Sequence, residues 1–210
     1  MVQATSTALT FDDFIALYPE NGGRYELRYG EMVEMRPIGP HEEVIALIRR
    51  KLDLEIEKYN LPYFIPQTCL VKPYKEAEGY LPDIIVLDKE KVKEDPYWKK
   101  ASSVSTGSAI RLIVEVVSTN WQDDYLTKLA EYEKLGVAEY WISDYRGLGG
   151  IRFIGSPKVP TVWIYELSKQ GDTSEFREGK AFREEDTLIS SNFPHLSLSV
   201  QQIIEAGQGH

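Results

Sequence analysis

The chain is 210 residues long, with 42% hydrophobic and 27% charged residues, the composition of an ordinary globular protein. Its formal net charge of -9 excludes a protein that coats nucleic acid without sequence preference, because such proteins neutralise many phosphates with Lys and Arg. A nucleic-acid substrate would require basic residues gathered on one face. The visible basic clusters lie at residues 49–51 and 89–100, and solvated surface is the ordinary interpretation of both.

The first half of the chain predicts two helices, a hairpin and two strands. Thr10 is a suitable N-cap for a short helix, and residues 24–35 are two strand-like segments around a Tyr-Gly pair, typical of a hairpin. Residues 41–60 predict a long helix, while residues 63–72 and 81–87 predict strands, the second an apolar run of the kind buried on both faces. The long helix is indicated by an apolar stripe at steps of three and four: Ile45, Ile48, Leu52, Ile56 and Tyr59.

The second half alternates strands with a helix. We expect a long exposed connection at residues 88–108, a buried strand at 112–117, a helix at 123–135 and a strand at 138–143. Further strands are expected near residues 151–154, 161–167 and 180–189. Together the elements predict an α/β fold, in which a mixed β-sheet is flanked by helices and antiparallel hairpins lie at both ends.

Length and cysteine content predict one domain in a reducing compartment. We expect residues 1–210 to form a single domain, with flexible ends at 1–10 and 205–210. A single cysteine, Cys69, excludes an internal disulfide framework and a zinc site built from several cysteines. The first residues have neither the basic start nor the apolar run of a signal peptide, and no apolar run approaches the roughly 20 residues that span a bilayer. We therefore expect a cytoplasmic protein.

Two carboxylates stand inside apolar strands. Asp83 begins an apolar run, and Glu115 sits in the middle of another. An isolated carboxylate is costly to desolvate, so each needs a cation or strong hydrogen-bond donors. Either residue alone could be an Asp at a strand entrance or a Glu on an exposed strand face. The pair, each on a strand that otherwise reads as buried, indicates a site.

Lys128 lies on the apolar side of the predicted helix at 123–135. The stripe that contains it recurs at steps of three and four: Trp121, Tyr125, Lys128, Tyr132 and Leu135. A lysine within such a stripe usually has a carboxylate partner or a catalytic task. It could also lie at the margin of the stripe and extend its amine to water, and Asp124, four residues earlier, could be its partner.

Two further residues are weaker candidates. His41 falls on the inner face of the first turn of the long helix, where a lone histidine is more often a packed or capping residue than a ligand. Glu26 lies in the first strand of the hairpin and could face either way. No Ser-His-Asp set, phosphate-binding glycine loop or zinc motif competes, and Gly147 to Gly150 follow a strand without opening a helix, as in a turn.

The ordered set of these motifs resembles the Uma-two family of endonucleases, which is placed in the PD-(D/E)XK, restriction-endonuclease-like superfamily. The resemblance spans roughly residues 11 to 200. It is carried by Tyr25-Glu26-Leu27 with Gly30-Glu31, His41, Pro82-Asp83, Val114-Glu115-Val116-Val117-Ser118, the series Asp124, Lys128 and Tyr132, and Gly136-Val137 followed by Glu139-Tyr140-Trp141-Ile142 and Asp144. As an ordered set these motifs are specific, although Pro-Asp alone would mean little.

The resemblance implies a restriction-endonuclease-like core and a role for each candidate. Asp83 and Glu115 would be the metal-binding acids, Lys128 the catalytic lysine, Glu26 a further acid of the site and His41 a residue commonly found with them. The superfamily pattern expects a lysine two residues after the second acid, where this chain has Val117. The resemblance implies that Lys128 has taken over that role.

These residue types suit phosphodiester hydrolysis with Mg²⁺ or Mn²⁺, because a hard cation polarises a phosphoryl oxygen and lowers the pKa of bound water. We therefore expect an endonuclease that acts on double-stranded DNA. The alternative is a catalytically degenerate, nuclease-like binding module associated with mobile DNA or a toxin system. Cutting both strands calls for two active sites, so a homodimer is expected. Aromatic residues of the C-terminal half offer surface for it, although most of them could simply be core: Tyr145, Phe153, Trp163, Tyr165, Phe176 and Phe182.

Overall fold

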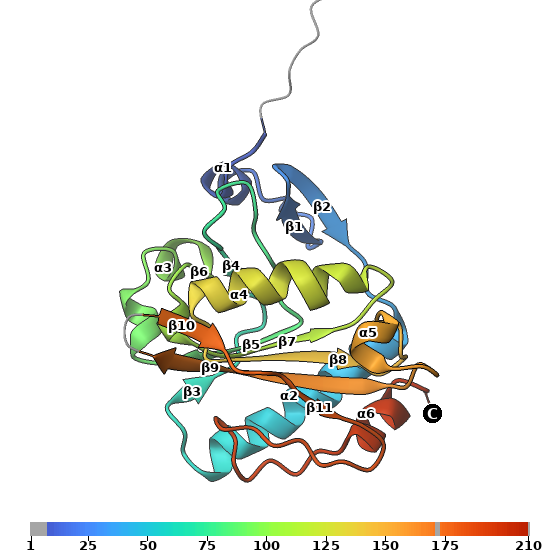
Figure 1. Ribbon diagram of the computed structural model, residues 1–210. Coiled ribbons are helices and arrows are strands. Elements are labelled where there is room, and N and C mark those ends of the chain that lie inside the picture. Colours follow the sequence, from blue (N-terminus) through green and yellow to red (C-terminus); the bar gives the residue numbers. More distant parts are fainter. Residues whose placement is uncertain (1–7, 171–172, 210) are drawn as a thin grey trace, which may run out of the picture.

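The computed structural model describes residues 8–170 and 173–209, built around one mixed β-sheet (Figure 1). The sheet has seven strands in the order β10-β9-β8-β7-β5-β3, with β11 also paired to β9. Among the described strand pairs of this sheet, β7 and β8 run parallel and the others are antiparallel. The strands are β3 (Tyr63–Phe64), β5 (Ile84–Asp88), β7 (Ile110–Val116), β8 (Glu139–Asp144), β9 (Thr161–Gln170), β10 (Thr173–Phe176) and β11 (Lys180–Phe182).

Helices cover both faces of this sheet (Figure 1). On one face lie α2 (Gly39–Lys58) and α6 (Val200–Ala206), and on the other lie the π-helical turn η3 (Asp123–Lys128) and α4 (Leu129–Leu135). Side chains alternate between the faces of a strand, so each central strand feeds both cores. On β7, Val114 packs toward α2 and Ile113 toward α4. The predicted mixed sheet with flanking helices is confirmed.

The crossover from β7 to β8 carries η3 and α4 and places Lys128 above the sheet. Parallel neighbours cannot be joined by a tight turn, so the chain returns through a helix on one face. The helix ends at Gly136, whose φ of 87° is left-handed and whose N–H donates to the carbonyls of Tyr132 and Glu133. Glycine adopts that conformation without steric cost. The predicted helix at 123–135 is confirmed, with its first half wound as a π-helix.

A smaller layer sits at one end of the molecule, at the top of Figure 1. Helix α1 (Phe11–Ala16) and the hairpin of β1 (Arg24–Arg28) and β2 (Glu31–Met35) bury Phe11, Phe14 and Leu27. Thr10 caps α1, as predicted, through reciprocal hydrogen bonds with Asp13. The backbone of Leu27 pairs with Gly79. This pairing docks the hairpin beside the start of β5.

Two expected segments of the first half differ from the structure. The expected strand at 63–72 is instead the short strand β3 and, after a break, β4 (Leu70–Val71), which pairs with β6 (Ser103–Val104). The expected exposed connection at 88–108 contains η1 (Lys91–Glu94), α3 (Trp98–Ala101), β6 and η2 (Gly107–Ala109). It folds inward because Asp95 is buried and its carboxylate accepts the N–H groups of Ser105 and Thr106.

Two strands expected in the second half also differ from the structure: one is a helical turn and the other is shorter. Residues 151–154 form a helical turn, α5 (Ile151–Ile154), because the preceding glycine turn lets Gly150 accept the N–H of Phe153. Four residues are too few for an apolar pattern to distinguish a strand from a helical turn. The expected strand at 180–189 stops at Phe182, and Glu184 has a left-handed φ of 51°, which a continuing strand cannot hold.

The chain ends and the aromatic residues can also be compared with what the sequence predicts. Of the ends expected to be flexible, residues 1–7 and 210 lie outside the described residues, while Thr10 caps α1 and α6 runs to Ala206. The aromatic residues expected to offer an interaction surface pack into the cores: Tyr145 and Phe182 are buried, and the other four are half-buried against the α4 side. Within residues 8–170 and 173–209, no helix is long and apolar enough to cross a membrane.

Candidate active site

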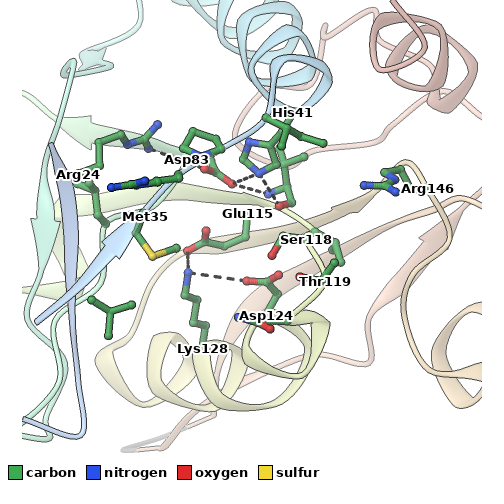
Figure 2. Close-up of a pocket in the computed structure, with 18 of the residues that line it drawn as sticks. Arg24, Met35, His41, Asp83, Glu115, Ser118, Thr119, Asp124, Lys128 and Arg146 are labelled. Carbon is green, nitrogen blue, oxygen red and sulfur yellow. Dashed lines mark hydrogen bonds and ion pairs between the residues drawn. The ribbon is translucent and has the colours of Figure 1, made fainter. Parts of the chain in front are cut away.

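A pocket of about 340 Å³ opens where β5 begins and β7 ends. Its walls come from β2, the start of α2, the segment after β7, η3 and the loop after β8. Four of the five predicted site residues line it: His41, Asp83, Glu115 and Lys128. Figure 2 shows these side chains pointing toward one another from different elements. Residues far apart in the sequence therefore share one cavity.

Asp83 and Glu115 are brought together by the pairing of β5 with β7. Ile84 is paired with Val114, so one further step of this antiparallel register sets Asp83 opposite Glu115. The carboxylate of Asp83 is fixed where β5 begins, because its Oδ2 accepts the N–H of Val116 at 2.8 Å. Side chains on alternate positions share a face, so Glu115 points toward η3 and α4 together with Ile113. The two acids thus meet at the same pocket.

His41 ties the start of α2 to the same point. Its Nε2 donates to the carbonyl of Val116 at 2.9 Å and lies 3.4 Å from Oδ2 of Asp83. Since a carbonyl oxygen only accepts, Nε2 carries a proton. Burial lowers the pKa of His41, but the contacts with Asp83 and the Val116 carbonyl outweigh it, so the pKa is raised overall. His41 therefore holds the carboxylate of Asp83 in place.

Lys128 lies among three carboxylates and is 4% exposed, which confirms its predicted position on the inward stripe. Its Nζ is 3.1 Å from Oε1 of Glu115, 3.2 Å from Oε1 of Glu26 and 3.8 Å from Oδ1 of Asp124. Oε1 of Glu115 also accepts the hydroxyl of Tyr132 at 2.8 Å. Asp124, the partner considered from the sequence, is thus the most distant of the three. Lys128 and Tyr132 together hold one oxygen of Glu115.

Glu26 sits behind the pocket and does not line it. It is 1% exposed, and both of its oxygens are engaged. Oε1 accepts the N–H of Leu81 at 3.0 Å and faces Lys128, while Oε2 pairs with Nη1 of Arg28 at 3.2 Å. Arg28 also reaches Oδ1 of Asp123 at 2.6 Å, which links the hairpin to η3. This arrangement suits an acid that positions Lys128.

The carboxylates of the cluster resist being ionised together, as the raised pKa values of two of them show. Burial, followed by the charges of Asp83, Asp124 and Glu26, raises the pKa of Glu115 to about 8, although Lys128 acts in the opposite direction. Burial likewise raises the pKa of Asp124 to about 7, again against Lys128. The pKa of Lys128 is well above its ordinary value; burial would lower it, but Glu115, Glu26 and Asp124 raise it. Such a cluster favours the uptake of a further cation.

Two carboxylate oxygens at the pocket accept no hydrogen bond from any described residue, although one of them, Oδ1 of Asp83, lies 3.8 Å from Nη2 of Arg24. Within the described part of the chain, Oδ1 of Asp83 and Oε2 of Glu115 accept no hydrogen bond, and neither is among the buried polar atoms that lack a partner. They therefore have access to the pocket. Mg²⁺ in proteins usually takes one or two carboxylates and keeps several waters. Among the described residues no group of three or more His, Cys, Asp and Glu could hold a metal ion.

Sequence reasoning named Asp124 as a possible partner of Lys128 but gave no role in the site to Tyr132 or Arg28. Asp124 lines the pocket beside Lys128, and Arg28 and Tyr132 orient Glu26 and Glu115. The helical spacing of Asp124, Lys128 and Tyr132 was the signal available for two of them. The role of Arg28 depends on how the hairpin docks. Val117, where the superfamily pattern expects a lysine, is 1% exposed and packs in the α4-side core.

The comparisons with known proteins agree with this architecture. A crystal structure of a protein from Anabaena variabilis, described as a "putative nuclease", is similar to this chain over 95% of its length and 99% of that protein, with a TM-score of 0.66. The two share 19% sequence identity, so the likeness shows the fold. No curated protein matches the chain. The family model of Uma2 (Uma-two), described as "Putative restriction endonuclease", matches residues 11–201, so the chain belongs to this nuclease-like family.

Proposed function

We propose that this protein is an endonuclease that hydrolyses phosphodiester bonds of double-stranded DNA with Mg²⁺ or Mn²⁺. The observation that carries the proposal is the meeting of Asp83, Glu115 and Lys128 at one pocket, with Nζ of Lys128 3.1 Å from Oε1 of Glu115. The family supports nuclease chemistry, and the net excess of carboxylates supports a cation.

The metal ligands would be Oδ1 of Asp83 and Oε2 of Glu115, the oxygens that have access to the pocket. When bound, a hard cation polarises a phosphoryl oxygen and lowers the pKa of a coordinated water. Asp124, whose carboxylate also faces the pocket, would accept hydrogen bonds from water there. Both metal-binding acids approach from strand ends, which are rigid supports for such a site.

The remaining residues would orient the reacting groups. Lys128 would direct the attacking water or stabilise charge growing on the phosphate, because a buried ammonium acts strongly where solvent is excluded. Glu26 holds the Lys128 ammonium from behind, and Tyr132 holds Glu115. His41 keeps the carboxylate of Asp83 in place and is a positioning residue in this proposal.

An acidic protein must still attract an anionic substrate. The pocket floor is acidic, but Arg24, Arg36 and Arg146 all line its walls. The basic cluster at 89–100 does not contribute, because it lies near η2, at the start of β7, and the pocket lies at the end of that strand. The rim arginines are therefore the groups that would lead a phosphate chain to the acids.

A cleavage assay tests the proposal. The purified protein is incubated with supercoiled plasmid, linear duplex, single-stranded DNA and RNA, in Mg²⁺, in Mn²⁺ and with a chelator. Metal-dependent cutting of duplex DNA that is lost in Glu115→Gln supports the proposal. Cutting that survives the chelator or the substitution contradicts it. Binding of DNA without any cutting would favour the degenerate binding module instead.

A homodimer and a cytoplasmic location belong to the same proposal. Cutting both strands of a duplex requires two active sites, and two-fold dimers are the commonest oligomers. The cytoplasmic location rests on the single cysteine, Cys69, which is free and buried. Light scattering that gives the mass of one chain at micromolar concentration would exclude the dimer.

A further inference from the structure

The rim of the pocket carries three arginines, and they differ in how their charge is used. Arg24 pairs with Glu42 at 3.3 Å and lies 3.8 Å from Asp83. Arg36 pairs with Glu34 at 2.6 Å. Arg146 is exposed and forms no ion pair with any described acidic residue. Of the three, Arg146 therefore has its charge available for a ligand.

The loop that carries Arg146 is firmly held. The buried carboxylate of Asp144 accepts the N–H of Leu148 at 2.8 Å and of Gly149 at 2.7 Å. Gly149 packs so closely on the ring of Tyr125 that an added Cβ would lie 3.1 Å from it. A guanidinium on a fixed loop loses less entropy when it binds than one on a mobile loop. The loop thus presents Arg146 at a defined position on the rim.

The neighbouring wall of the pocket consists of neutral hydrogen-bonding groups. Ser118, Thr119 and Asn120 follow β7, are exposed and line the same pocket. In Figure 2, Arg146 extends toward the pocket from its loop, and Ser118 and Thr119 lie between it and Glu115. Hydroxyls, an amide and an unpaired guanidinium are the groups that proteins use to contact phosphate oxygens.

We propose that Arg146, with the hydroxyls of Ser118 and Thr119, binds a phosphate of the nucleic-acid strand beside the one that reaches Asp83 and Glu115. The inference rests on the proposed function and adds a substrate contact to it. Arg146 acts by anchoring the strand; the acids and Lys128 act on the scissile group. A guanidinium suits this task because its planar fork matches two phosphate oxygens.

The test measures binding of a fluorescently labelled DNA duplex in Ca²⁺, over a range of salt concentrations, by fluorescence anisotropy. Arg146→Gln should weaken binding about tenfold or more. It should also reduce the slope of log affinity against log salt by about 0.9, the value for one lost phosphate contact. Arg146→Lys keeps the charge, so it should retain the slope and lose part of the affinity.

The matched control is Arg152→Gln. Arg152 is exposed on α5, lies over the ring of Phe153 and does not line the pocket, so the same charge change there should leave affinity and slope unaltered. If Arg146→Gln and Arg152→Gln behave alike while the wild type binds DNA, the inference is wrong and the proposed function stands. If the wild type does not bind the DNA duplex, both are wrong. Thermal melts confirm that the exposed substitutions leave the fold intact.

Discussion

Two buried glutamates on neighbouring strands show how differently a carboxylate can be accommodated. Glu139 on β8 is fully buried and is surrounded by donors. It accepts the Nε1–H of Trp141 at 2.6 Å, the amide of the Asn192 side chain at 2.8 Å and the hydroxyl of Ser190 at 3.0 Å. Burial raises its pKa, and these hydrogen bonds oppose that rise. Glu139 thus anchors the segment at 190–192 to the sheet.

Glu115 on β7 is almost as buried but is satisfied in another way. Its Oε1 accepts the hydroxyl of Tyr132 and pairs with the ammonium of Lys128, and its Oε2 has access to the pocket. Burial therefore does not separate a structural acid from a candidate site acid. The two acids differ in their partners. Glu139 is surrounded by fixed neutral donors, whereas Glu115 is paired with a lysine and keeps one oxygen accessible from the pocket.

The largest effect is expected from Glu115→Gln. Removing this charge should lower metal-dependent cleavage by about 10³-fold, the upper scale for one electrostatic group in an active site. The melting temperature should not fall, because Gln keeps the shape and relieves repulsion from Asp83 and Asp124. Initial rates and thermal melts measure the two quantities. A variant that unfolds, or that cuts at the wild-type rate, would place Glu115 with the structural acids.

Lys128→Met should lower cleavage by about 10²-fold. It should also destabilise the fold by about 3–5 kcal/mol, because it leaves buried Glu115 without its cation and Glu26 with Arg28 alone. Urea titrations measure the stability. Adding Glu26→Gln to Lys128→Met should recover part of the stability and none of the activity. Recovery of activity in the double variant would contradict a catalytic role for the lysine.

Glu139→Gln should behave in the opposite way to Glu115→Gln: it should lower stability and leave cleavage unchanged. An amide cannot accept all the hydrogen bonds of Glu139, so the free energy of unfolding should fall by about 1–3 kcal/mol. Cleavage by the folded protein should be unchanged, because Glu139 does not line the pocket. Urea titration and the assay at a temperature below the transition check both expectations. Loss of activity with unchanged stability would break the contrast between the two glutamates.

The last prediction concerns the dependence of stability on pH. The pKa of Asp124 rises from 3.8 to about 7 on folding, so the folded state binds this proton more tightly than the unfolded state. The resulting stabilisation is complete below 3.8 and is lost as pH rises toward 7. Asp124→Asn lacks this titration. The free energy of unfolding of the wild type relative to Asp124→Asn, measured by urea titration, should therefore decline between pH 3.8 and about 7. If the free energies of the two proteins change with pH in parallel, the prediction is wrong.

Much of the cluster could be predicted from the sequence because its members break an apolar pattern. Asp83 and Glu115 interrupt buried strands, and Lys128 interrupts an apolar helical stripe, so each stood out locally. Glu26 was a weaker candidate whose role came from the resemblance, since its burial depends on the docking of Leu27 against Gly79, a contact between distant segments. Arg146 lies on an exposed loop, where an arginine looks ordinary until the pocket is known.

The same reasoning explains the errors in the fold. The central strands and long helices carry enough residues for a period to emerge, and they were predicted correctly. Residues 151–154 were too short for that, and their helical turn follows from the glycine turn before them. The segment at 88–108 looked polar and exposed. It folds inward because the carboxylate of Asp95 accepts backbone N–H groups of the same segment, and composition does not predict such hydrogen bonds.

The peptide groups around Val116 have a consequence for how this site can change in evolution. Its N–H holds Asp83 and its carbonyl holds His41, so main-chain atoms position both side chains. No substitution at residue 116 removes those atoms, except that proline would remove the N–H. Substitution of Val116 by another apolar residue would keep both hydrogen bonds, and so the positions of Asp83 and His41. Relatives can therefore diverge at this position, and the loss of valine is no sign that the site has decayed.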